Sequence, residues 1–464
     1  MFVKRFFEPS LAQASYMIGC QTAGEAIVID ANRDVDAYIQ VAAREGLRIT
    51  HVTETHIHAD YVSGSRELAQ RTGASLCLSD EGDKDWKYKF EHARKLKHGD
   101  RIDIGNVRVE VLHTPGHTPE HLTFLITDGA AADKPIAAVT GDFVFVGDVG
   151  RPDLLEKAAN IKGTMEEGAR TLYRSLQTFT KHEDWLQIWP GHGAGSSCGK
   201  GISAIPSSTL GYEKRFNWAF NQKSEADFVN EVLAGQPEPP KYFAKMKRIN
   251  KEGPPILGRF HTPQKIDRAQ LPTLIEKRQL VIDTRPAADY AAGHVPGTIN
   301  IPLNSSFVSW AGWLVDTEEV YLIVDASTAS ARLNEVSRAL ALIGIDRIAG
   351  YFEGAASMGR ATICPITPKE LATKLTEVTV IDVRSANEWS HGHLPGAKHI
   401  PLGYLIDRLG EIPGDKPVVV QCQSGGRSQI AASILERAGF RDVANLTGGL
   451  SAWTASGLAV EEAA

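Results

Sequence analysis

Short runs of apolar residues rich in Val, Ile and Leu recur along the chain and predict buried β-strands. Strand-like segments cover 25–30, 48–54, 107–112, 122–126, 280–285, 380–384 and 418–422. Apolar residues at helical spacing predict helices over 35–45, 165–178 and 430–438, with Thr164 as the expected N-cap of the second. Strands that are apolar throughout are typical of parallel sheets covered on both faces. The pattern therefore predicts an α/β multidomain protein.

A repeat occupies the second half of the chain. The segment 281–303 recurs 99 residues later as 380–402, with Gly-His-X-Pro-Gly and Ile-Pro-Leu at matching positions in both copies. Each copy opens with a strand-like run, which predicts two α/β domains in tandem. The first part of the chain lacks this repeat and carries the clustered histidines. We predict three domains, at 1–250, 258–362 and 366–464.

The composition changes this picture little. Hydrophobic residues make up 42% and charged residues 23% of the 464, as in ordinary globular proteins. A net charge of −6 predicts no nucleic-acid partner and no binding to an anionic membrane. No apolar run is long enough to span a membrane, and the N-terminal stretch is too short for a signal peptide. Five scattered cysteines without a CxxC pair favour a reducing compartment, so a cytoplasmic protein is expected.

The segment after residue 54 has the pattern of a metal site. His56, His58 and Asp60 occupy alternate positions at the end of a strand-like run, and alternation in an extended chain places them on one side. Two further motifs, Thr-Pro-Gly-His ending at His117 and Thr-Gly-Asp ending at Asp142, can supply more ligands. Imidazole and carboxylate groups are common ligands of transition metals. A metal centre in the first domain is therefore predicted.

Together with Pro-Gly-His-Gly around His192, these motifs resemble the metallo-β-lactamase superfamily, which implies an αβ/βα sandwich. Dinuclear hydrolases of that superfamily normally have a histidine where this chain has Tyr61, and a neutral phenol is a poor ligand beside imidazole. Only Asp60 and His192 then remain for a second metal, and two protein ligands make a weak site. One metal is predicted.

Two longer runs, 141–154 and 189–200, are similar to persulfide dioxygenases. The resemblance implies one Fe(II) held by His56, His117 and Asp142, a face that leaves about three coordination positions open for a persulfide sulfur and O2. The resemblance also implies that four other residues orient these ligands: His58, Asp60, Tyr61 and His192. Three candidates for contact with the thiol substrate are Arg151, Tyr173 and Cys198; Cys198 could relay sulfur or simply fill a buried space.

Residues 418–428 read as strand, loop and helix, with Cys422 at the end of the strand. Successive N–H groups of such a loop can surround the sulfur and stabilise a persulfide anion. The segment resembles the rhodanese loop, which implies Cys422 as the nucleophile and Arg427 as an anion-binding group. Four residues separate the two, whereas related phosphatases have five, which favours sulfur over phosphoryl transfer. Gln423 replaces the arginine of many thiosulfate-using rhodaneses, so high activity with thiosulfate as donor is not expected.

The middle repeat has the scaffold without the nucleophile. No cysteine occurs between Cys198 and Cys364, and Asp325 stands about where the catalytic cysteine belongs. An acidic side chain would repel persulfide and sulfite anions. An inactive rhodanese-like domain is predicted, with spacing, docking or oligomerisation as its role.

The whole chain resembles persulfide dioxygenase–rhodanese fusions of the CstB type. The resemblance implies that a low-molecular-weight thiol persulfide and O2 react at one Fe(II) to give sulfite and thiol, and that Cys422 passes sulfane sulfur to sulfite to form thiosulfate. We expect a homo-oligomer that acts in sulfide detoxification. Two alternatives stay open: a glyoxalase-II-like zinc thioesterase fused to a sulfurtransferase, and a non-catalytic sulfur sensor or scaffold.

Overall fold

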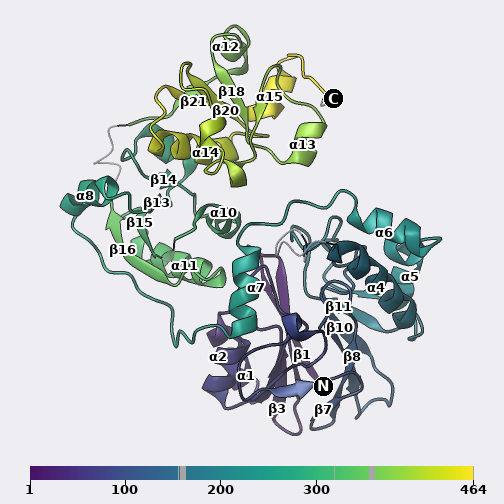
Figure 1. Ribbon diagram of the computed structural model, residues 1–464. Coiled ribbons are helices and arrows are strands. Elements are labelled where there is room, and N and C mark those ends of the chain that lie inside the picture. Colours follow the sequence, from purple (N-terminus) through teal and green to yellow (C-terminus); the bar gives the residue numbers. More distant parts are fainter. Residues whose placement is uncertain (155, 157–162, 318, 355–360, 463–464) are drawn as a thin grey trace. The chain divides into compact units, whose positions relative to one another are not determined.

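The computed structural model describes residues 1–464 except 155, 157–162, 318, 355–360 and 463–464 (Figure 1). The chain divides into two compact units. The first comprises Met1–Arg259 with Ala341–Gly344, and the second Phe260–Leu340 with Ile345–Ala464. The predicted α/β class is confirmed, because both units combine helices with sheets. Among the described residues, no helix is long and apolar enough to cross a membrane.

Two six-stranded sheets form the first unit. The first sheet has the strand order β1 (Phe2–Glu8), β2 (Gln13–Cys20), β3 (Glu25–Ile29), β4 (Arg48–Thr53), β5 (Ser75–Ser79) and β6 (Arg94–Leu96). The second has the order β12 (Ser208–Thr209), β11 (Gln187–Pro190), β10 (Ala137–Gly141), β9 (Leu122–Asp128), β8 (Val107–His113) and β7 (Arg101–Ile104). β3 to β6 pair in parallel, as do β10 and β11, and the remaining pairs are antiparallel.

The core of this unit lies between the two sheets, where alternate residues of facing strands such as Ile18, Ile27, Val109 and Phe124 are fully buried. Helices cover the two outer faces. One face carries α1 (Val35–Arg44) and α2 (Ser65–Thr72), and the other carries α4 (Thr164–Phe179), α5 (Leu210–Phe216) and α6 (Glu225–Leu233). A further helix, α7 (Phe243–Glu252), contacts the loop after β4 through Asn250. The layers are those of the expected αβ/βα sandwich. One local prediction was wrong: the N-cap of α4 is Gly163, with φ of 80°, and Thr164 is already helical.

The second unit contains two parallel sheets. One has the order β14 (Ile299–Asn300), β13 (Val281–Asp283), β15 (Glu319–Val324) and β16 (Arg347–Glu353). The other has the order β17 (Cys364–Ile366), β21 (Val443–Leu446), β20 (Val418–Gln421), β18 (Thr379–Asp382) and β19 (Lys398–His399). Their helices are α8 (Leu271–Glu276), α9 (Ala287–Ala292), α10 (Phe307–Leu314), α11 (Ala329–Leu342), α12 (Pro368–Ala372), α13 (Ala386–Ser390), α14 (Gly426–Arg437) and α15 (Gly449–Ala455).

The repeat seen in the sequence recurs as structure. Arg285 bonds to Asp283 at 2.6 Å and to the Gly293 carbonyl, and the equivalent Arg384 bonds to Asp382 at 2.7 Å and to the Gly392 carbonyl. Each buried arginine thereby ties a strand end to the turn after the following helix. This shared contact explains why the Asp-X-Arg and Gly-His motifs keep the same spacing in both copies.

Candidate metal centre and cysteine loop

Strand ends place the histidines and carboxylates of the first unit together. His56, His58 and Asp60 follow β4, His117 follows β8, Asp142 follows β10 and His192 follows β11. Gly141 makes the turn before Asp142 with φ of +49°, and a Cβ there would lie 2.4 Å from the Thr55 hydroxyl. Only glycine therefore fits at this point, where two ligand-bearing loops touch.

His56, His117 and Asp142 converge into one donor set. Their ligand atoms all lie within 4.8 Å of one another, with Asp142 Oδ2 3.6 Å from His117 Nε2 and 4.0 Å from His56 Nε2. The three side chains are at most 3% exposed. Within the described residues, neither oxygen of Asp142 has a hydrogen-bond partner. A buried carboxylate without donors, whose Oδ2 faces the imidazole nitrogens of His56 and His117, fits a divalent metal ion held by two histidines and one carboxylate.

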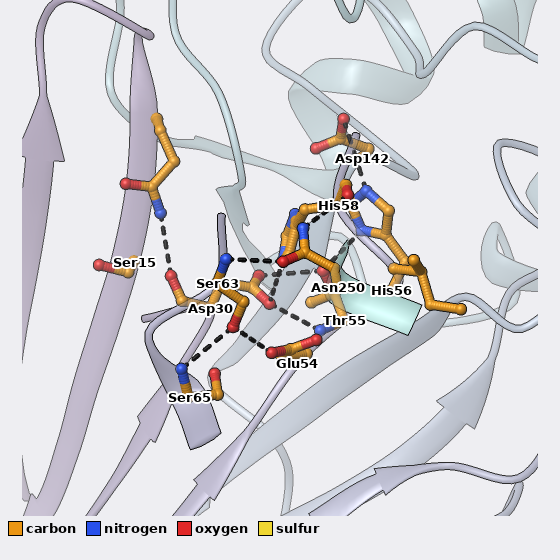
Figure 2. Close-up of polar contacts among 12 residues, drawn as sticks. Ser15, Asp30, Glu54, Thr55, His56, His58, Ser63, Ser65, Asp142 and Asn250 are labelled. Carbon is orange, nitrogen blue, oxygen red and sulfur yellow. Dashed lines mark hydrogen bonds and ion pairs between the residues drawn. The ribbon is translucent and has the colours of Figure 1, made fainter. Parts of the chain in front are cut away.

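Hydrogen bonds at the far side of each ring point Nε2 at this set. His117 Nδ1 lies 2.9 Å from the Arg151 carbonyl, an acceptor, so Nδ1 carries the proton and the Nε2 lone pair is free. His56 Nδ1 lies 3.0 Å from the Thr55 hydroxyl, which itself donates to Asp30 at 2.9 Å. Figure 2 shows this relay from Asp30 through Thr55 to His56. The relay leaves the hydroxyl as an acceptor for Nδ1–H and fixes the metal-binding tautomer of His56.

His58 points its Nε2 at the Asp30 carboxylate (Figure 2). Its Nε2 lies 3.1 Å from Asp30 Oδ1. Burial opposes the charge on this ring, but the carboxylates of Asp30, Glu54 and Asp60 raise the pKa of His58 to about 9. An imidazolium has no lone pair for a metal, so its geometry and charge both suit a supporting group.

A second donor set lies beside the first and was not anticipated. Asp60, His192 and Cys198 also bring ligand atoms within 4.8 Å of one another, and all three are buried. The prediction that only Asp60 and His192 would remain for a second ion was therefore wrong, because the loop after β11 folds Cys198 into the pocket. Burial and the carboxylates of Asp142 and Asp60 raise the pKa of the Cys198 thiol well above its usual value. A neutral thiol is a weak ligand, and only the thiolate binds metals strongly.

Tyr61 is fully buried, and its hydroxyl donates to the Asp30 carbonyl at 3.3 Å. Asn250 on α7 fixes the loop that carries Tyr61: its amide donates to the His58 and Tyr61 carbonyls at 2.8 and 2.7 Å and accepts from Ser63 N–H. Figure 2 shows Asn250 reaching the loop after β4. The loop is thus held from a helix almost two hundred residues away in sequence.

Three supporting residues escaped the sequence analysis. Asp30 and Asn250 stand outside the histidine motifs and act through contacts that only the fold creates. The third, His121, is fully buried; its ring stacks on His56 at 5.2 Å and its Nε2 accepts from the Asp142 N–H at 3.2 Å. The available signal was its position four residues after His117, in the same loop.

Two of the substrate candidates have other partners. The Arg151 guanidinium is fully buried; it bonds to both oxygens of Asp153 at 2.7 Å and to the Ser197 carbonyl. Tyr173 packs on the outer core with Phe228 at a ring distance of 5.4 Å. Neither of these side chains belongs to a donor set, whereas Cys198 belongs to the second one.

In the second unit, Cys422 follows β20 directly and is almost fully buried. The Gly425 N–H donates to its sulfur at 3.1 Å and the Ser428 hydroxyl at 3.4 Å. Gly425 has φ of +101°, which turns its N–H toward the sulfur and opens α14. A sulfur surrounded by N–H and O–H donors at a helix start is a site for an anion.

Arg427 is held by Glu388 of α13, with two bonds of 2.6 and 2.5 Å. Burial alone would raise the pKa of Glu388, but the Arg427 guanidinium holds it at about 2. The pair carries no net charge. The donors offered to an anion at this loop are therefore chiefly N–H and hydroxyl groups, and Glu388 neutralises the neighbouring guanidinium.

The register of the two parallel sheets identifies the equivalent of Cys422 in the middle repeat. Asp283 pairs with Ile323, and Asp382 pairs with Gln421. Val324 follows Ile323, and Cys422 follows Gln421. The middle repeat therefore has a buried valine, Val324, at the position of the nucleophile. Asp325, the predicted substitute, lies one residue farther on and instead accepts bonds from Ser327.

Comparison with known proteins follows the same division. The Metallo-beta-lactamase superfamily matches residues 10–192, and the Rhodanese-like domain family matches 267–357 and 367–456. Human mitochondrial persulfide dioxygenase ETHE1 is 30% identical over 203 residues, which are 41% of this chain and 68% of the relative. A probable metallo-hydrolase of Burkholderia pseudomallei (strain 1710b) is 29% identical over 205 residues, 38% of this chain and 67% of the relative. A crystal structure of a metallo-beta-lactamase from Staphylococcus aureus subsp. aureus COL has a TM-score of 0.70 and 46% identity, and the match covers 76% of this chain and 99% of that one.

Proposed function

Because this chain belongs to the metallo-β-lactamase superfamily, with an ETHE1-like domain followed by two rhodanese-like domains, we propose that it is a persulfide dioxygenase joined to a sulfurtransferase. The overall oxidation is RSSH + O2 + H2O → RSH + SO3²⁻ + 2H⁺, where RSSH is a low-molecular-weight thiol persulfide. The observation that carries the proposal is the buried set of His56, His117 and Asp142. Sulfide detoxification follows as its role.

The first active site has to hold one metal and keep one face open. Iron(II), bound by His56, His117 and Asp142, supplies the redox chemistry between O2 and the persulfide sulfur, for which a two-histidine, one-carboxylate face is suited. The relay through Thr55 and the Arg151 carbonyl keep both imidazoles in the ligating tautomer. All three side chains are buried, which removes the metal position from the protein surface.

Three features favour a single ion. Tyr61 stands where a histidine would otherwise serve, and its hydroxyl is committed to the Asp30 carbonyl. His58 is held as a cation by Asp30. The Cys198 thiol resists ionisation among carboxylates. A second ion at Asp60, His192 and Cys198 would have to displace that proton first.

The second site transfers sulfur at Cys422. Its thiolate attacks the terminal sulfur of a persulfide, the S–S bond breaks, and the thiol leaves: RSSH + CysS⁻ → RS⁻ + CysSSH. After loss of a proton, CysSS⁻ + SO3²⁻ → CysS⁻ + S2O3²⁻. The Gly425 N–H and Ser428 hydroxyl bind the anionic sulfur in both steps. Thiosulfate would thus combine the products of both sites.

A zinc thioesterase is the second candidate, favoured by the neighbouring donor set and the hydrolase relative. Oxygen-electrode measurements on iron-loaded protein with glutathione, cysteine and coenzyme A persulfides separate the two. The proposal expects persulfide-dependent O2 uptake and sulfite. Thioester hydrolysis by the zinc form, without O2 uptake by the iron form, would replace it. A homo-oligomer, a cytoplasmic location and the three domain bounds stay predictions from the sequence.

A further inference from the structure

The second unit contains a cleft that borders the Cys422 loop and has no part in the chemistry above. Its volume is about 490 Å³. One wall comes from the loop and helix that follow Cys422, with Ser424, Arg427 and Ile430. The facing wall comes from the middle domain, with Asn304, Ser306 and Trp310 at the start of α10. The domain that lacks a nucleophile therefore supplies one wall of the cleft beside the Cys422 loop.

Buried and partly buried hydrogen bonds hold these two walls together. The Ser433 hydroxyl on α14 accepts from the Asn300 N–H at 2.9 Å, and His294 Nε2 lies 2.6 Å from Glu436 Oε2. Arg437 donates to the carbonyls of Gly297 and Gln279. All these contacts run between α14, which begins beside Cys422, and the middle domain. The cleft is a fixed feature of the second unit.

The polar groups of the facing wall are mostly donors. The Asn304 side-chain oxygen accepts from the Ser306 N–H at 2.9 Å, so its amide nitrogen is the group left to meet a ligand. Across the described residues, the Trp310 indole N–H has no hydrogen-bond partner, and the indole also offers a flat apolar face. Arg427 across the cleft is neutralised by Glu388. This lining suits a small molecule with an apolar stem and amide or carboxylate oxygens.

The volume selects among the reactants of Cys422. Sulfite and inorganic polysulfide are too small to fill about 490 Å³, which is the size of a site for a compact organic ligand. The organic body of a thiol persulfide has the required size and carries acceptor oxygens. Its terminal sulfur has to reach Cys422, past Ser424 and Arg427 on the rim of the cleft.

We propose that this cleft binds the organic body of the persulfide that donates sulfur to Cys422, and that the middle domain thereby determines donor specificity. The inference rests on the proposed sulfur transfer, in which RSSH + CysS⁻ → RS⁻ + CysSSH. Asn304 and Trp310 are positioning residues, because they contact the part of the donor that does not react. Sulfite, which attacks later, needs only the Cys422 loop.

The test uses the full chain without O2, so that the dioxygenase is silent, and measures thiosulfate formed from sulfite and three donors. The donors are inorganic hydropolysulfide, cysteine persulfide and glutathione persulfide, in order of increasing body size. For the unmodified chain, kcat/KM should rise at least tenfold along the series. Trp310→Ala and Asn304→Ala should raise the KM for glutathione persulfide at least fivefold, and leave kcat, the KM for sulfite and the use of hydropolysulfide within twofold.

Ser305→Ala is the matched control, since Ser305 is exposed on the same segment and does not line the cleft. It should behave as the parent. If the unmodified chain had the same kcat/KM with all three donors, the inference would be overturned without any variant, while sulfur transfer itself would stand. Equal losses with all three donors would also overturn it. No transfer from any donor would contradict the proposed function, and the inference with it.

Discussion

Asp30→Asn tests the relay that sets the tautomer of His56. Asp30 accepts three hydrogen bonds: from Thr55 N–H at 2.7 Å, from the Thr55 hydroxyl at 2.9 Å and from His58 Nε2 at 3.1 Å. Asparagine has the same shape, but one oxygen becomes an NH2 donor. The amide nitrogen has to face the hydroxyl, because the opposite orientation would set it against the Thr55 N–H donor. The hydroxyl then turns its proton toward His56 Nδ1, and the ring proton moves to Nε2, where a metal should bind.

The size of the effect follows from one unsatisfied donor. To ligate a metal, His56 in the variant must return its proton to Nδ1, which leaves the Thr55 hydroxyl with two donors and no acceptor. Such a buried donor costs about 1–3 kcal/mol. At about 1.4 kcal/mol for each factor of ten, the Fe(II) affinity should fall between about fivefold and about 150-fold. This range agrees with the roughly 10–100-fold losses typical of groups that orient metal ligands.

Anaerobic titration of the full chain with Fe(II) against a chromogenic chelator measures this affinity without any activity assay. Asp103→Asn makes the same chemical change at a side chain that is 55% exposed and forms an ion pair with Arg101, so this variant should bind iron as the parent does. Thermal melts of both variants check folding. A folded Asp30→Asn protein with an Fe(II) affinity within twofold of the parent would refute the tautomer argument.

Three further predictions concern single residues. Asp142→Ala should abolish persulfide-dependent O2 uptake while anaerobic sulfur transfer at Cys422 stays within twofold, as measured by oxygen electrode and thiosulfate assay; loss of both activities would contradict separate sites. Cys422→Ser should release sulfite in place of thiosulfate, and an unchanged rate of enzymatic thiosulfate formation would show that sulfur moves by another route. Burial raises the pKa of Glu120 from 4.5 to about 7. As the pH rises from 4.5 to about 7, Glu120 therefore ionises in the unfolded chain before it ionises in the folded one, and the free energy of unfolding falls. Glu120→Gln, which keeps an acceptor for the Ile57 N–H, should therefore gain up to about 3 kcal/mol over the parent at pH 8 and little at pH 4, in denaturant melts at both values; an equal gain at both pH values would point to packing.

The sequence predicted elements whose cause is local. Runs such as Val418–Gln421 become strands because β-branched residues bury both faces of a parallel sheet, and Cys422 follows at the strand end as expected. The repeat could be recognised in the sequence because Asp382 and Arg384, which contact each other, are only two residues apart, and the same spacing occurs in both copies. The convergence of His56, His117 and Asp142 was foreseen through motif resemblance, and the fold brings these three into one set.

The missed features depend on contacts between distant segments. Nothing near Asn250 in sequence indicates that its amide fixes the loop of His58 and Tyr61. The position of Cys198 beside Asp60 depends on the path of a loop that sequence periodicity does not describe. Val324, rather than Asp325, matches Cys422 because strand register is set by pairing with β13, and a shift of one residue is invisible in the sequence.

Anomalous diffraction from the full chain, produced in iron-replete medium and crystallised without O2, tests the central claim most directly. Data on both sides of the iron and zinc absorption edges identify and count the ions. We predict one iron peak among His56 Nε2, His117 Nε2 and the Asp142 carboxylate, with no metal against the Cys198 sulfur. Two ions bridged by Asp142, or zinc alone at full occupancy, would contradict it.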